Sequence, residues 1–92
     1  MQVTLLEIFT DSENEGYYVL RVADDNSDII SDIPLLDMSP TTGLTVAKWK
    51  TSTRKRDQGK RVIGVYFWIS IMGHELDQWR YYDLDLGKDV SK

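Results

Sequence analysis

The chain has 92 residues, no cysteine, one histidine and a formal net charge of −4 at pH 7. This length provides for a single domain over residues 1–92, and the lack of cysteine excludes disulfides and thiol catalysis. Hydrophobic residues make up 41 % of the chain, which is too many for a disordered protein. The chain starts without a signal-peptide pattern and has no apolar run that could span a bilayer as a helix. We therefore expect a cytoplasmic protein that does not enter membranes.

The N-terminal quarter of the chain predicts a β-hairpin. Residues 3–10 are rich in β-branched and apolar side chains, and residues 17–23 alternate between an apolar and a polar face. Residues 11–16, between them, are polar and end in glycine, which is typical of a turn.

The next segment has weaker signals. Residues 24–28 are polar and predict a loop, and residues 39–43 predict a second one. Residues 29–38 fit either a strand or one short helical turn that ends before Pro34, because the residue before a proline disfavours the helical conformation.

Two further strands are predicted over residues 44–51 and 62–72. In the first, Lys48 and Lys50 share one face and Trp49 lies on the other. The second is the strongest strand of the chain, with an apolar side chain at every second position.

A closing hairpin is predicted by a two-residue type II′ turn at residues 73–74, which places glycine at its first position. This register pairs Trp68 with Trp79 and Tyr66 with Tyr81 on one face, and it makes the other face apolar. Two alternatives stay open for the aromatic face. A small barrel or sandwich would cover it as core, whereas exposed rings would offer surfaces for stacking.

These elements predict an all-β, mostly antiparallel domain of five or six strands, with at most one short helix. A barrel, a roll and a sandwich are all compatible with this pattern.

The charges of the chain are divided unevenly. Residues 48–61 hold seven basic side chains and one acid, a net charge of +6, whereas the other 78 residues hold four basic and fourteen acidic side chains, a net charge of −10. Because crowded like charges repel one another and must face water, we expect the basic segment to project, unneutralised, from an acidic body.

The basic segment predicts a non-enzymatic binding protein for single-stranded nucleic acid or another short polyanion. Basic side chains neutralise phosphates, and neighbouring aromatic rings stack on unpaired bases. The expected nucleic-acid site comprises Lys48, Lys50, Arg54, Lys55, Arg56, Lys60 and Arg61, with Trp68 and Trp79 as stacking residues.

The acidic remainder supports an alternative hypothesis. A compact acidic protein can occlude the basic surface of a protein partner, as an immunity-like inhibitor or a phage or bacterial accessory protein would. A chain with two oppositely charged regions can also form oligomers head to tail. The simplest interpretation of both regions is solvated charge that keeps a small protein in solution.

No catalytic, metal or cofactor site is indicated. His74 is the only histidine and lies in a predicted turn, which excludes an ordinary zinc site and argues against a serine–histidine–aspartate triad. Asp24, Asn26 and Asp28 have the spacing that opens a calcium-binding loop, but Ile29 occupies the position that requires glycine. We therefore predict that the protein is not an enzyme and that it binds no metal or cofactor.

Overall fold

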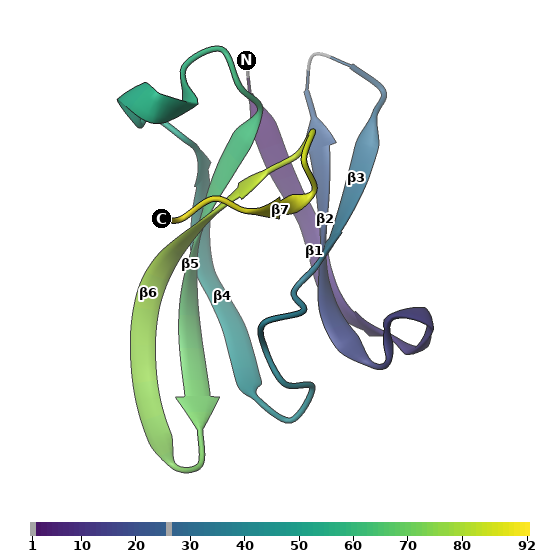
Figure 1. Cartoon of the computed structure of the whole chain (residues 1–92), viewed down its shortest axis with the longest axis vertical. Coiled ribbons are helices and arrows are strands. Elements are labelled where there is room, and N and C mark those ends of the chain that lie inside the picture. The colour runs from purple at the N-terminus through teal and green to yellow at the C-terminus, as the bar shows by residue number, and fades with distance from the viewer. Residues whose placement is uncertain (1, 26) are drawn as a thin grey trace.

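Seven β-strands make up most of the computed structural model, which describes residues 2–25 and 27–92. They form two antiparallel sheets, one of three strands and one of four, that enclose a core between them (Figure 1). The predicted all-β antiparallel class is confirmed, but the arrangement is not a closed barrel. No helix in the described parts of the chain is long and apolar enough to cross a membrane.

The first sheet has the strand order β1-β2-β3. The predicted N-terminal hairpin is confirmed by β1 (Val3–Asp11) and β2 (Tyr17–Asp24), which are joined by the 3₁₀ turn η1 (Ser12–Asn14). The third strand, β3 (Ile30–Pro34), pairs with β2 and resolves the open alternative in favour of a strand. Asn26, which belongs to the predicted loop before β3, lies outside the described residues.

The second sheet has the strand order β4-β5-β6-β7. Its strands are β4 (Gly43–Thr51), β5 (Val62–Ile71), β6 (His74–Asp83) and β7 (Lys88–Asp89). The prediction of five or six strands is therefore wrong by at least one. The unexpected strand is β7, which has only two residues and no periodicity that a sequence pattern could show.

The turn between β5 and β6 differs from the prediction. Its two loop residues are Met72 and Gly73, with φ angles of 50° and 82°, so the turn is type I′ and the predicted type II′ turn at residues 73–74 is wrong. Tyr66 consequently pairs with Trp79, and the predicted Trp68–Trp79 pair does not form. Because the register moves by two residues, every side chain still lies on its predicted face.

The core is built from alternate positions of the facing strands. Leu20 and Val22 of β2 and Ile63, Val65 and Phe67 of β5 are fully buried in a single cluster between the sheets. The other side chains of β5 consequently point away from the first sheet.

The two sheets meet along one edge of the molecule, where β1 approaches β4. The backbone nitrogen of Val3 donates a hydrogen bond to the Thr51 Oγ1 atom at 3.0 Å. This contact joins the start of the chain to the end of β4, directly before the basic loop.

Candidate nucleic-acid interface

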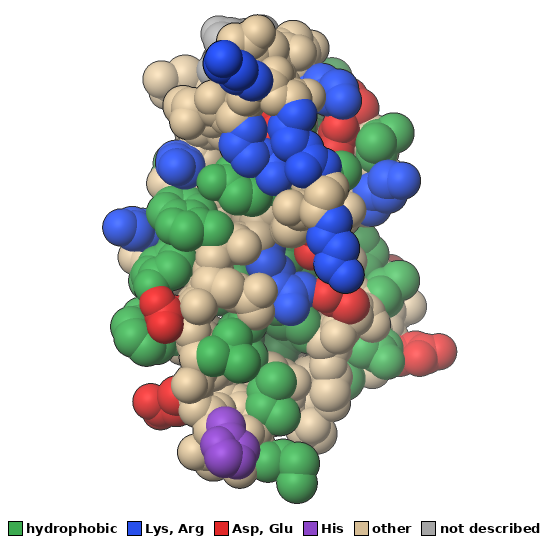
Figure 2. Space-filling model, turned by 60° about the vertical axis from the view of Figure 1, so that its left-hand side comes forward, with side chains coloured by type: hydrophobic (Ala, Val, Ile, Leu, Met, Phe, Trp, Pro, Cys, Tyr) green, Lys and Arg blue, Asp and Glu red, His purple; other side chains and the backbone are tan. Residues whose placement is uncertain are grey.

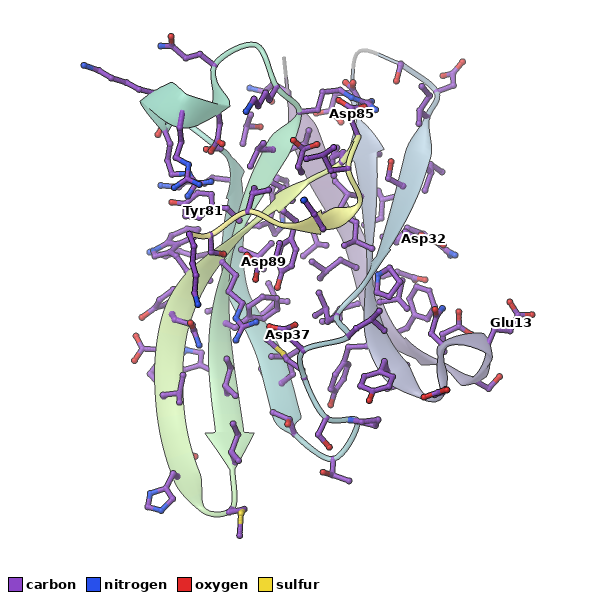
Figure 3. All side chains as sticks on the ribbon, viewed as in Figure 1. Glu13, Asp32, Asp37, Tyr81, Asp85 and Asp89 are labelled. Atoms are coloured by element: carbon purple, nitrogen blue, oxygen red, sulfur yellow. The ribbon has the colours of Figure 1, made fainter. Side chains whose placement is uncertain are left out.

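The aromatic side chains of β5 and β6 lie on the outer face of the second sheet. Trp68 is 49 % exposed, and Tyr66, Trp79 and Tyr81 are half-buried. Figure 3 shows Tyr81 on the side of β6 that is turned away from the first sheet. The alternative in which these rings are part of the core is therefore wrong. We call the outer surface of β4, β5 and β6 the aromatic face.

The rings form one continuous row across the aromatic face. The centroid of Tyr66 lies 6.5 Å from that of Trp68 and 5.3 Å from that of Trp79. Trp79 and Tyr81 are stacked, with their centroids 6.3 Å apart. The row results from the register, because Tyr66 and Trp79 are direct cross-strand partners.

Gly64 leaves room for the ring of Tyr81, which is the last in the row. It is the cross-strand partner of Tyr81, and a Cβ atom at this position would lie 2.8 Å from Cε2 of that ring. The ring can therefore lie over the backbone of β5 only because residue 64 has no side chain.

A β-bulge in β4 determines which of its residues face the rings. The register shifts between Val46 and Lys48, so that Lys48 lies opposite Tyr66 and Lys50 lies opposite Gly64. The Lys50 ammonium is 4.6 Å from the centroid of Trp79, and the Lys48 ammonium is 5.4 Å from that of Tyr66. Lys48 and Lys50 therefore share the aromatic face with the rings, and cation–π attraction holds them there.

Arg54 leads from the aromatic face into the loop between β4 and β5. Its guanidinium lies 3.8 Å from the centroid of Tyr81, and its Nε donates a hydrogen bond to Asp57 at 2.6 Å. Nη2 also donates to the backbone oxygen of Val90 at 3.0 Å. The hydrogen-bond donors of Arg54 are therefore directed at the protein itself and not at solvent.

Asp57 holds this loop together. Asp57 is the last residue of the 3₁₀ turn η2 (Lys55–Asp57), and it is almost fully buried. Its carboxylate accepts hydrogen bonds from Ser52 and Arg54, both at 2.6 Å. Burial raises the pKa of Asp57, but the hydrogen bonds from Arg54 and Ser52 outweigh this effect and hold the pKa below its ordinary value. The carboxylate is therefore ionised at neutral pH.

Arg61 lies at the other end of the loop and connects the two sheets. Its Nε donates to Asp85 at 3.0 Å, and its Nη1 donates to Asp24 of β2 at 3.0 Å. The hydrogen bonds to Asp85 and Asp24 raise the pKa of Arg61 above its ordinary value. The expectation of an unneutralised basic segment is therefore wrong for Arg54 and Arg61, which are folded back onto the protein's own carboxylates.

The remaining cations of the loop are exposed. Arg56 donates to the backbone oxygen of Lys92, and no ion pair or hydrogen bond joins the side chains of Lys55 and Lys60 to other described residues. Figure 2 shows basic side chains gathered at one end of the molecule, with hydrophobic side chains of the sheet below them. The free positive charge is therefore carried mainly by lysines.

A shallow hollow of about 280 Å³ adjoins Trp68 at the end of the aromatic face farthest from the basic loop. Its lining includes Gly43, Thr45, Trp68, Ser70 and Glu75. Sequence analysis missed this hollow, because the residues that surround Trp68 are determined by the pairing of three strands.

Comparison with known proteins gives no assignment, since no family model, no curated protein and no solved structure matches this chain. Within the described residues, no group of three or more histidine, aspartate or glutamate side chains is arranged to hold a metal ion.

Proposed function

We propose that the protein binds single-stranded nucleic acid on the aromatic face. The observation that carries this proposal is the continuous row of rings from Trp68 to Tyr81, with Lys48 and Lys50 along one side of it. Ammonium groups neutralise phosphates, and ring faces stack on unpaired bases. A sheet that carries both groups on one open face suits single strands, whose bases are free to stack.

The three strands of the aromatic face contribute different groups to the proposed binding. Lysines occur on β4, the outermost strand, and rings occur on β5 and β6. A strand whose phosphates follow β4 would lay its bases across β5, where same-face side chains recur about every 6.6 Å. Lys55 and Lys60 would extend this path beyond the end of β4.

Trp68 offers the most accessible stacking surface. Lys48 and Lys50 lie over Tyr66 and Trp79, so a base can stack on those rings only if the ammonium groups move to its phosphates. Among the described residues, no cation lies over Trp68, which is half-exposed. The first base is therefore expected to stack on Trp68.

Fluorescence anisotropy with a labelled thymidine oligonucleotide at low salt tests this function. We expect measurable binding that weakens steeply as salt is added. In Lys50→Ala the slope of log K against log salt should fall by about 0.7, the value for one lost phosphate contact with a single strand. Trp68→Leu should weaken binding about five-fold or more, because one stacked base contributes about 1–3 kcal/mol.

Lys88→Ala is the matched control, because Lys88 is an exposed lysine on β7 that lies beside Pro34 and Leu36, and among the described residues it lies over none of the rings of the aromatic face. It removes the same charge and should leave the salt slope unchanged. Absence of binding by the wild-type protein at low salt would refute the proposal. An equal loss in Lys50→Ala and Lys88→Ala would show that binding depends only on overall charge.

A further inference from the structure

The hollow beside Trp68 has a different chemistry from the rest of the aromatic face. Thr45 and Asp77 are the cross-strand neighbours of Trp68, and Glu75 is the neighbour of Ser70. The hollow thus combines one half-exposed ring with two hydroxyl groups and the carboxylate of Glu75. No hydrogen bond or ion pair occupies the Glu75 carboxylate among the described residues, so it is available to accept hydrogen bonds from a ligand.

The place of this carboxylate relative to the lysines determines what it would meet. Lys48 and Lys50 lie on β4, Trp68 lies on β5, and Glu75 lies on β6. A nucleotide with its phosphate toward β4 and its base on Trp68 would direct the hydrogen-bonding edge of that base toward β6. A carboxylate there can only accept hydrogen bonds, so it favours a base whose edge presents donors.

We propose that the hollow receives a guanine base, with the ring on Trp68 and the Watson–Crick edge on Glu75; this inference rests on the proposed function. Guanine places its N1–H and N2–H donors side by side, which matches the two oxygens of one carboxylate. Adenine and cytosine present a single amino group there, and thymine presents a single imide N–H. Glu75 therefore discriminates in favour of guanine, because only guanine offers a donor to each of its two oxygens.

A basic protein side chain is the other ligand that an aromatic ring beside a carboxylate could take. The neighbouring row of the aromatic face argues against it, because Lys48 faces Tyr66 directly beside Trp68. That ammonium attracts a phosphate and repels a second cation. The two hydroxyl groups of Thr45 and Ser70 also suit the sugar and base of a nucleotide.

Competition between oligonucleotides tests the inference. The probes are a thymidine oligonucleotide and the same oligonucleotide with one central guanine, inosine or adenine. We expect the guanine probe to bind the wild-type protein about five-fold or more tightly than the thymidine probe, the low end of a bidentate contact. Inosine, which lacks the N2 amino group, should lose most of this preference.

Glu75→Gln should bring the ratio of guanine to thymidine affinity close to one. Asp77→Asn is the matched control, because Asp77 lies on the same strand opposite Trp68 but does not line the hollow. Both variants remove one negative charge and should raise the affinity for the thymidine probe by a similar factor, but only Glu75→Gln should also remove the preference for guanine. The affinity ratio of the two probes is therefore the informative measurement.

The outcomes separate the two proposals. If all probes bind the wild-type protein equally and Trp68→Leu weakens them all, guanine recognition is wrong and the proposed function stands. A guanine preference that persists in Glu75→Gln also overturns the inference. If no probe binds, both proposals fail. If N-acetylarginine amide quenches the fluorescence of the wild-type protein but not of Trp68→Leu, and guanosine monophosphate does not, the hollow receives a basic side chain instead.

Discussion

Three residues, Gly64, Arg54 and Asp57, determine how the side chains are arranged at the end of the aromatic face nearest the basic loop. Gly64 allows the Tyr81 ring to lie over β5, and Arg54 in turn lies over that ring. Asp57 then anchors Arg54 from the other side. This stack of side chains connects a buried strand to the basic loop, so a change at residue 64 should affect the loop as well as the sheet.

Gly64→Ala should destabilise the protein by about 1–3 kcal/mol, because the added methyl group overlaps the Tyr81 ring and forces it to move. Urea unfolding followed by tryptophan fluorescence measures this cost. In a Tyr81→Leu background the same substitution should cost less, since the ring is gone. An equal cost in both backgrounds would show that the ring does not cause the strain.

Asp57 should make stability depend on pH in the acidic range. Its pKa in the folded protein lies below the unfolded value, so its stabilising contribution is complete above about pH 4 and is lost as the pH falls through the folded value. The free energy of unfolding of Asp57→Asn should therefore fall less between pH 5 and pH 2 than that of the wild type.

Asp28→Asn removes the same charge from an exposed residue and serves as the control. Its free energy of unfolding should follow the wild-type pH dependence. If Asp57→Asn and Asp28→Asn behave alike, the ionised Asp57 is not a source of the acid sensitivity.

Among the elements, the β5–β6 hairpin contains a local conflict between sequence and conformation. Its type I′ turn requires positive φ at both loop residues, which glycine adopts readily and methionine adopts only at an energetic cost. Met72 is 94 % exposed, so it gains no packing in return. This turn is therefore a place where the sequence is not optimal for the structure that it adopts.

Met72→Asn should raise the free energy of unfolding by about 1 kcal/mol, because asparagine followed by glycine is favoured in type I′ turns and tolerates positive φ. Chemical denaturation gives this value directly. Gly73→Ala, in the same turn at a φ of 82°, should act in the opposite direction. A loss of stability in Met72→Asn would mean that the turn is not type I′.

At the scale of the whole molecule, four of the five arginines form ion pairs with the protein's own carboxylates, whereas no lysine among the described residues does. Arg21 bridges β1 and β3 by binding Glu7 and Asp32, and Arg61 joins the two sheets through Asp24 and Asp85. The planar guanidinium can bind two partners at once, whereas the lysine ammonium is a single point of charge. A nucleic acid would therefore meet mostly lysines, and the hypothesis of an acidic face for a basic protein partner stays a prediction.

Arg61→Gln should lower the urea midpoint of unfolding, because it removes the contacts of one side chain with both sheets. Lys55→Gln makes the same change in charge at an exposed position and should leave the midpoint within error of the wild type. If both substitutions shift the midpoint equally, the loss of positive charge rather than the bridge explains the effect.

The sequence by itself determined the five longest strands and the faces of their side chains, but not β3 or β7. Alternation has a period of two residues and is a local property, so the apolar and aromatic faces of β5 and β6 were predicted correctly even with the wrong turn. The polar segment at residues 11–16 and the strand at residues 62–72 were likewise visible from local composition.

Only the tertiary structure decided which residues meet. A shift of two residues keeps every face but changes every pair, so the row of rings and the hollow beside Trp68 could not be derived from alternation. Arg61 binds Asp24, 37 positions away along the chain, and a count of local charge cannot show that such a carboxylate is near. The free cations and the outward direction of the aromatic face therefore depend on how the two sheets pack.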